Sequence, residues 1–225
     1  MRLTTVGGDS AAGRYRARHP LRDLFRGTSV LIVEDEYFLA DDLARRFESA
    51  GAMVVGPAGS VSSSLAEVNR AGVVGVAVLD IRLGGELVFP VADELSGRAI
   101  PFVFVSGYDE VALPARYRHR RRLRKDADLD AVVAAALAER AFAEVMSEDF
   151  PGDADEPDVE AMLPRLRLMA RLLTGEKASA DDLVAEALRH AIAHAGTRPR
   201  AVSLLRWLVG MIEELWLANM RSRPH

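Results

Sequence analysis

Three apolar runs, each ending in polar residues, decide the fold of this chain: VLIVEDE at residues 30–36, VAVLD at 76–80 and FVFVSGY at 102–108. Runs rich in β-branched and aromatic residues predict strands that are buried on both faces of a parallel sheet. The carboxyl ends of such strands meet at one edge of the sheet, where open α/β sheets bind their ligands. The polar residues that end the three runs are therefore expected to form one site.

The polar residues at this edge have the chemistry of a phosphoryl acceptor. Glu34, Asp35 and Asp80 bring carboxylates together, and like charges this close need a cation if all are to stay ionised. Mg²⁺ suits the site because it is a hard cation that prefers oxygen ligands. With the metal bound, Asp80 can accept a phosphoryl group as a nucleophile, while Mg²⁺ and Lys125 neutralise the phosphoryl oxygens. Ser106 is predicted to hydrogen-bond the attached group.

The rest of the N-terminal half alternates between predicted strands and helices. Strands are expected at 29–34, 52–56, 74–80, 101–106 and 121–124, and helices at 37–50, 61–70, 88–97, 109–117 and 128–146. Turn signals such as Gly56-Pro57 and Gly84-Gly85 separate them. This alternation predicts an α/β fold with a doubly wound, five-stranded parallel sheet.

Residues 28 to about 145 resemble the receiver domains of bacterial two-component response regulators. The resemblance is carried by an ordered set of residues in their strand contexts: Glu34-Asp35, Asp80, Ser106 and Lys125. It implies a flavodoxin-like domain in which Asp80 is phosphorylated by a sensor histidine kinase or a phosphotransfer protein. It also implies Mg²⁺ as the cofactor, and no enzymatic activity beyond the domain's own phosphorylation and dephosphorylation.

The resemblance assigns a role to each residue of the site. Asp80 is the implied phosphoacceptor, Lys125 the lysine that pairs with the phosphoryl group, and Ser106 the switch hydroxyl. The implied metal ligands all offer an oxygen atom: Glu34, Asp35, Asp80 and the backbone carbonyl of Arg82.

Three segments resemble an alphaproteobacterial-type subgroup of receivers: DIRLGGE at 80–86, FPVA at 89–92 and FVSGY at 104–108. That subgroup carries an aromatic residue in its switch loop. The resemblance therefore makes Tyr108 a candidate switch residue beside Ser106.

Two positions depart from the usual receiver pattern. Asp126 follows Lys125 where most receivers have a proline, so the loop is expected to hold the ammonium group less rigidly. Arg122 stands three residues before the lysine, where many receivers carry an aromatic residue. The usual coupling through an aromatic rotamer cannot operate there, and Tyr108 is the candidate substitute.

Composition agrees with a cytoplasmic signalling protein. The 225 residues contain no cysteine, which excludes disulfides and thiolate chemistry. No apolar run is long enough to span a bilayer, so no membrane association is expected. The formal net charge of −4 does not favour binding to bulk nucleic acid.

Two polar stretches set the expected domain limits. Residues 1–27 are Arg-rich without apolar periodicity, and we predict a disordered basic leader, with a polyanion-binding arm as the alternative. Residues 147–157 are acidic and contain Pro and Gly, which is typical of a linker. The receiver is then expected at 28–146 and an output domain at 158–225. A second basic run at 116–125 lies either on the partner face of the receiver or on a solvated edge.

The output domain is predicted to be a small all-α bundle. Apolar residues recur at helical spacing over three segments: 159–173, 183–192 and 199–220. Gly175 is the expected end of the first helix. Ser179, with Asp182 three residues later, resembles a capping box at the start of the second helix.

Residues 158–223 resemble region 2 of extracytoplasmic-function sigma factors. The resemblance rests on four segments: LPRLR at 163–167, ARLLTG at 170–175, ADDLVAEAL at 180–188 and LRWL at 205–208. Ala185 stands where the family usually has Gln on a helix that meets RNA polymerase, and Glu213-Glu214 stand where it tends to have Arg-Asn. Carboxylates near phosphates oppose DNA binding, and no segment resembles the promoter-reading region 4.

A sigma fold without the DNA chemistry of a sigma factor suggests mimicry. The chain resembles the general-stress response regulators of alphaproteobacteria, which combine a receiver with a sigma-like domain that captures an anti-sigma factor when phosphorylated. We therefore predict that phosphorylation of Asp80 switches a protein-interaction domain. Its output is either capture of an anti-sigma factor or homodimerisation through the apolar surface around Trp207, Met211 and Trp216. Two alternatives remain: a transcriptional regulator that binds DNA or RNA polymerase, and a phosphate sink without direct output.

Overall fold

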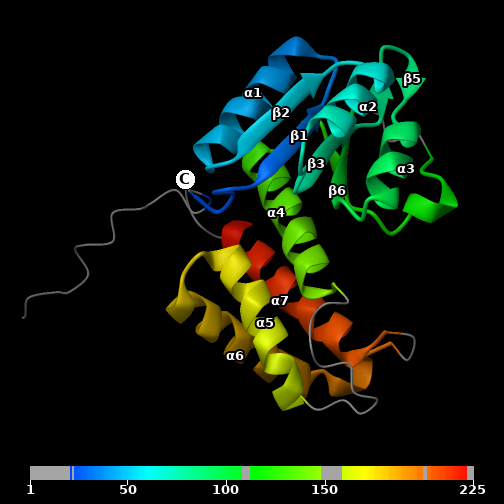
Figure 1. Cartoon of the computed structure of the whole chain (residues 1–225). Coiled ribbons are helices and arrows are strands. Elements are labelled where there is room, and N and C mark those ends of the chain that lie inside the picture. The colour runs from blue at the N-terminus through cyan, green and yellow to red at the C-terminus, as the bar shows by residue number, and fades with distance from the viewer. Residues whose placement is uncertain (1–20, 22, 108–111, 148–158, 200–201, 222–225) are drawn as a thin grey trace, which may run out of the picture.

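A parallel sheet of five strands organises the N-terminal part of the chain, in a computed structural model that describes residues 21, 23–107, 112–147, 159–199 and 202–221 (Figure 1). The strands, in sheet order, are β2 (Met53–Ala58), β1 (Ser29–Val33), β3 (Val76–Asp80), β6 (Phe102–Ser106) and β7 (Arg122–Arg124). The helices are α1 (Tyr37–Ser49), α2 (Val61–Arg70), α3 (Phe89–Gly97) and α4 (Leu129–Val145). The predicted doubly wound α/β fold is confirmed, with the flavodoxin-like strand order.

Both faces of the sheet are buried, and alternate residues of a strand serve opposite faces. In β3, Val76 and Val78 join the apolar cluster that includes α1 and α4, whereas Ala77 and Leu79 join the cluster that includes α2 and α3. This two-sided burial explains why the strand reads as a continuous apolar run. The register places Asp80 beside Val105 of β6, so the carboxyl ends of both strands lie at one edge.

A short antiparallel hairpin that the sequence pattern does not predict follows β3. Its strands are β4 (Arg82–Leu83) and β5 (Glu86–Leu87), and Gly84-Gly85 joins them. The two glycines have φ angles of 57° and 98°, a backbone conformation that residues with a Cβ rarely adopt. The glycine pair therefore permits a tight turn directly after Asp80.

The predicted helix at 109–117 is wrong in the part that the structure describes. Residues 112–114 have no regular structure, and one turn of 3-10 helix follows at Ala115–Tyr117. Pro114 explains the difference, because a proline disfavours helical backbone in the residue before it. The buried ring of Tyr117 then packs against the aromatic side chains of β6.

The end of the predicted leader is folded onto the sheet domain. Leu21 and Phe25, which the sequence analysis placed in a disordered tail, are fully buried. The ring of Phe25 packs edge to face on that of Phe47 in α1, with 5.3 Å between centroids, and its backbone N–H donates to the carbonyl of Ala50 (3.0 Å). The prediction of disorder is wrong for these residues, because burial of two large apolar side chains stabilises the fold even within a basic segment. Residues 1–20 lie outside the described part.

The C-terminal part contains the expected helices: α5 (Val159–Thr174), α6 (Lys177–Ala193) and α7 (Leu204–Arg221). Gly175 follows the end of α5 with a φ of 73°, as predicted. The capping box predicted at Ser179 is wrong, because α6 already begins at Lys177 and Glu176 is its N-cap residue. Among the residues described, no helix has the length and apolar character needed to cross a membrane.

The third C-terminal helix begins later than the sequence predicts. A turn of 3-10 helix at Ala195–Thr197 comes first, and α7 starts at Leu204 rather than near Pro199. The backbone N–H of Arg206 donates to Oγ of Ser203 (3.3 Å), which satisfies one of the unpaired donors of the first turn. Ser203 thus marks the start that the apolar pattern did not locate.

Helix α4 belongs to both parts of the molecule. It packs on β3, β6 and α1 and also on α5 and α7, and Figure 1 shows it running from the sheet into the helical bundle. Nine of its 17 residues are buried, as is expected of a helix covered on several sides. One continuous apolar cluster includes side chains of β1, α4, α5 and α7. The N-terminal and C-terminal parts therefore share a core.

A charged cluster lies beside this shared core. The guanidinium of Arg121 pairs with the carboxylates of Glu139 on α4 (3.8 Å) and Glu213 on α7, and Arg120 also pairs with Glu139 (3.5 Å). Burial raises the pKa of Glu139 and of Glu213, and the arginines oppose this rise only in part. Part of the basic run at 116–125 thus contacts the C-terminal helices.

Candidate phosphoacceptor site

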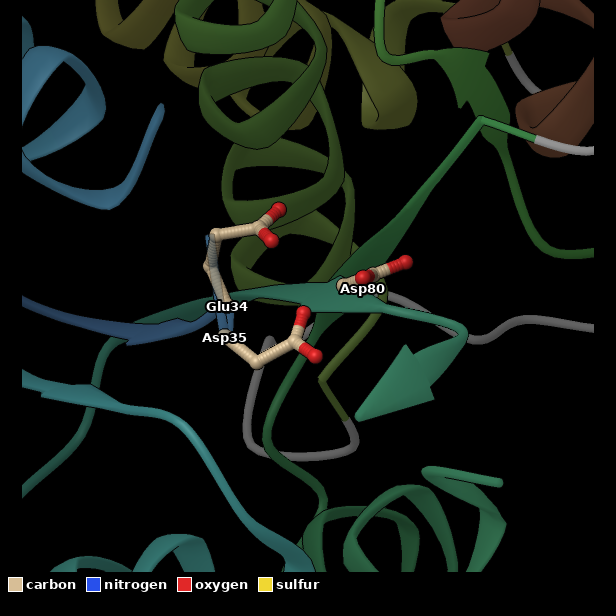
Figure 2. A group of neighbouring side chains, drawn as sticks. All are labelled: Glu34, Asp35 and Asp80. Atoms are coloured by element: carbon tan, nitrogen blue, oxygen red, sulfur yellow. The ribbon is translucent and has the colours of Figure 1, made fainter. Parts of the chain in front are cut away.

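Three carboxylates meet at the carboxyl edge of the sheet (Figure 2). Glu34 and Asp35 directly follow β1, and Asp80 is the last residue of β3. One oxygen from each lies within 4.8 Å of the others. Glu34 and Asp80 are buried and Asp35 is exposed, so the cluster opens to solvent on one side.

Backbone N–H groups hold these carboxylates in place. The N–H of Gly84 donates to Oδ2 of Asp35 (2.8 Å), and the N–H of Arg82 donates to Oδ1 of Asp80 (3.2 Å). The N–H of Glu36 donates to Oε1 of Glu34 (3.0 Å). Two of these donors belong to the hairpin after β3, which therefore positions acidic groups from two strands.

Lys125 lies at the centre of the negative charge. Its Nζ atom lies 2.8 Å from a carboxylate oxygen of Asp80, 2.7 Å from one of Glu34 and 2.6 Å from one of Glu36. Its backbone N–H donates to the carbonyl of Ser106 (3.0 Å), which ties the lysine to the end of β6. The side chain is therefore anchored at both the backbone and the ammonium group.

Burial governs the protonation of this cluster. It raises the pKa of Glu34 and of Asp80, and the hydrogen bonds and charge of Lys125 oppose this rise only in part. Burial alone would lower the pKa of Lys125, but hydrogen bonds to Asp80, Glu34 and Glu36 outweigh it and raise that pKa. The raised pKa keeps the lysine protonated.

This donor set suits a hard divalent cation. Mg²⁺ prefers oxygen ligands and binds proteins through one or two carboxylates while it keeps several waters. The close oxygens of Glu34, Asp35 and Asp80 provide such ligands, and the exposed Asp35 faces the solvent from which an ion and its waters arrive. The backbone carbonyl of Arg82 stays a predicted further ligand.

The remaining predicted residues lie around this cluster. Ser106 is buried at the end of β6, and its Oγ lies 3.5 Å from Nη2 of Arg122. Asp126, which replaces the usual proline, accepts hydrogen bonds from the guanidinium of Arg124 (2.9 and 3.2 Å). Tyr108, the candidate aromatic switch residue, lies outside the described residues.

Sequence reasoning missed two contributors to the site. Glu36 is a direct partner of Lys125, and Gly84 donates to Asp35 through its backbone. The third acidic residue of the EDE sequence at 34–36 was the available signal for Glu36. The sequence marks Gly84 only as part of a turn signal, because its donation to Asp35 depends on the geometry of the hairpin.

Residues 159–212 match a family model described as the Sigma2 domain of PhyR. They follow a five-stranded sheet with a carboxylate cluster and lysine at its edge. This combination matches a receiver-like domain followed by a sigma2-like domain. The expected resemblance to sigma region 2 is confirmed over the matched residues.

Solved structures similar to this chain include a receiver domain and a response regulator. SdrG from Sphingomonas melonis Fr1 is 38% identical, with 50% of this chain and 95% of that chain covered and a TM-score of 0.42. The receiver domain of PhyR from Erythrobacter litoralis is 22% identical (56% and 95% covered, TM-score 0.45). PhyR from Brucella abortus is 27% identical (54% and 51% covered, TM-score 0.46). No curated protein matches the chain.

Proposed function

We propose that Asp80 accepts a phosphoryl group from a sensor histidine kinase or a phosphotransfer protein in a Mg²⁺-dependent reaction. The observation that carries this proposal is the position of Asp80: its buried carboxylate lies 2.8 Å from Nζ of Lys125 and within the cluster formed with Glu34 and Asp35. A nucleophilic carboxylate, an anchored cation and a set of metal ligands are the parts that phosphoryl transfer to a carboxylate requires.

The residues of the site have distinct tasks in this reaction. A carboxylate oxygen of Asp80 forms a bond to phosphorus while the bond from phosphorus to the nitrogen of the donor histidine breaks. Lys125 moves a hydrogen bond from a carboxylate to a phosphoryl oxygen, and the hydroxyl of Ser106 donates to another. Mg²⁺, held by the acidic cluster, supplies further positive charge for the phosphoryl oxygens.

The proposed output is a protein-interaction switch in the sigma2-like domain. Glu213, which stands where sigma factors tend to have a basic segment, pairs with Arg121 just before β7, and Lys125 directly follows that strand. Changes at the phosphoacceptor site and contacts of α7 are thus linked through one short strand. Phosphorylation shifts the output only if the two states differ in these contacts. The proposed partner is an anti-sigma factor or a second copy of the chain.

The experiment compares wild type with Asp80→Asn, a substitution that retains the shape of the side chain. We expect wild type to take up a phosphoryl group from acetyl phosphate in the presence of Mg²⁺ and Asp80→Asn to take up none, as measured by intact-protein mass. Unchanged uptake by Asp80→Asn would show that the acceptor lies elsewhere.

A second experiment identifies the output. Wild type loaded with Mg²⁺ and beryllofluoride, a phosphoryl mimic, is used for capture from a lysate and for sedimentation, with Asp80→Asn as the control. State-dependent capture of a small anti-sigma-like protein supports mimicry, and state-dependent self-association supports dimerisation. Neither change, together with normal loading, would contradict a switched output and favour a phosphate sink.

A further inference from the structure

We propose that Arg122 is a second cationic ligand of the phosphoryl group on Asp80, acting from β7 on the side of the site formed by Ser106. This inference rests on the proposed phosphorylation of Asp80 and adds a residue to that site. Its starting point is a position where the chain has a guanidinium in place of the aromatic residue found in many receivers.

The register of the sheet brings Arg122 to the site. Arg122 lies opposite Phe104 in the parallel pair of β6 and β7, so Ser106, two residues further along β6, is its diagonal neighbour on the same face. The distance from Nη2 of Arg122 to Oγ of Ser106 is 3.5 Å. Ser106 in turn follows Val105, the partner of Asp80 in the next strand pair. The guanidinium therefore lies next to the hydroxyl that is expected to bind the phosphoryl group.

The contacts of Lys125 leave a role for an additional cation at the phosphorylated site. Nζ of Lys125 contacts Glu34, Glu36 and Asp80, and an ammonium group has only three N–H donors. A phosphoryl group carries about −1.5 to −2 charges and strong acceptor oxygens. Lys125 must therefore release a carboxylate before it can bind the new group. A guanidinium brings five donors in a planar arrangement that matches phosphate oxygens.

Arg122 takes part in no covalent step under this proposal. The carboxylate oxygen of Asp80 forms the bond to phosphorus, and the donor leaves with the electron pair of the bond that breaks. Arg122 transfers no proton and donates hydrogen bonds to the phosphoryl oxygens. Its effect is therefore expected on the affinity for the phosphoryl group and its mimics rather than on Mg²⁺ binding.

Arg124 provides a matched control. It has the same side chain, lies two residues further along β7 and pairs in register with Ser106. Its guanidinium, however, binds both carboxylate oxygens of Asp126, and its side chain is 62% exposed. Replacing Arg124 therefore removes the same charge from the same strand but keeps the contact between Arg122 and Ser106.

The test titrates beryllofluoride in excess Mg²⁺ into the full chain and follows the bound fluorine atoms by NMR. We expect the Kd of Arg122→Gln to rise about tenfold, as is typical when one hydrogen bond to a charged group is lost. Arg122→Lys should recover part of this loss because it keeps a cation, and Arg124→Gln should bind as wild type does. The Mg²⁺ affinity measured without beryllofluoride should be the same in all four proteins.

Several outcomes would overturn the proposal. One is an equal beryllofluoride affinity of wild type and Arg122→Gln. Another is an Arg122→Lys variant that binds beryllofluoride as weakly as Arg122→Gln. A loss of Mg²⁺ affinity in Arg122→Gln would show that Arg122 has a merely structural role. Asp80→Asn separates this failure from that of the proposed function. If Asp80→Asn binds beryllofluoride as tightly as wild type, the phosphoacceptor assignment itself is wrong.

Discussion

Asp35 is the member of the acidic cluster through which Mg²⁺ binding can be tested most cleanly. It is exposed and its carboxylate is fixed by the backbone N–H of Gly84. Lys125 contacts the other two carboxylates of the cluster, Glu34 and Asp80. A change at Asp35 therefore removes a predicted metal ligand while leaving these ion pairs of Lys125 intact.

Mg²⁺ should stabilise the folded protein, because the folded state assembles the carboxylates that the unfolded chain keeps apart. We expect the midpoint of thermal unfolding to rise on addition of MgCl₂ and to return with EDTA. Asp35→Asn should lose most of this rise. Glu86→Gln, a change in the hairpin outside the cluster, is the control and should keep it. A full Mg²⁺ effect in Asp35→Asn would exclude Asp35 as a ligand.

Phe25 tests whether the end of the predicted leader is part of the core. Truncation of a fully buried Phe to Ala removes apolar contacts and leaves a cavity, so Phe25→Ala should lower the free energy of unfolding by about 3–5 kcal/mol. Phe38→Ala is the matched control, because that ring is 81% exposed and its loss should change stability by less than about 0.5 kcal/mol. Urea denaturation measures both, and equal stability of the two variants would contradict the burial of Phe25.

At the scale of elements, the sequence predicted what depends on apolar periodicity. Apolar runs predicted the strands of the sheet domain, and apolar residues at helical spacing predicted its helices. The polar residues at the ends of the apolar runs predicted the carboxylates of the site. The hairpin that holds Asp35 was not predicted, because its strands have only two residues each. The same limit applies to Leu21 and Phe25, which are too few to form a period. Sequence patterns locate an element well when many residues repeat one signal. They locate it poorly when a single turn or contact determines whether the element forms.

The ion pair between Arg121, which precedes β7, and Glu213 of α7 gives a prediction about pH. Because burial raises the pKa of Glu213, the folded protein holds this proton at pH values where the unfolded chain has released it. This contribution to stability is complete below the pKa of the unfolded chain and is lost as pH rises through the folded pKa. Glu213→Gln removes this titrating group. The free energy of unfolding of the variant, relative to that of wild type, should therefore increase from about pH 4 to about pH 7.

The neighbouring residue supplies the control for this pH effect. Glu214 lies on the same helix but is exposed, and its charge adds to the rise in the pKa of Glu213 that burial causes first. Glu214→Gln should therefore weaken the wild-type pH dependence without removing it. Urea denaturation at several pH values measures all three proteins. A stability difference between Glu213→Gln and wild type that does not change with pH would show that burial does not control the protonation of Glu213.

At the scale of the whole molecule, the shared core around α4 couples the two parts. Both tryptophans, Trp207 and Trp216, lie in α7, whereas the carboxylate cluster proposed to bind Mg²⁺ lies at the edge of the sheet. Tryptophan fluorescence therefore reports on α7, whereas the proposed ligands bind at the edge of the sheet. The cooperativity of unfolding between the two parts can therefore be measured on the full chain.

If the continuous apolar cluster makes the molecule one cooperative unit, a ligand of the receiver stabilises α7 as well. We expect Mg²⁺ and beryllofluoride to raise the unfolding midpoint seen by tryptophan fluorescence by the same amount as the midpoint seen by far-UV circular dichroism. Asp80→Asn should show neither shift with beryllofluoride. A fluorescence midpoint that stays fixed while the circular dichroism splits into two transitions would instead show that the parts unfold independently. In that case α4 would unfold with the sheet, and its contacts with α5 and α7 would contribute little to coupling.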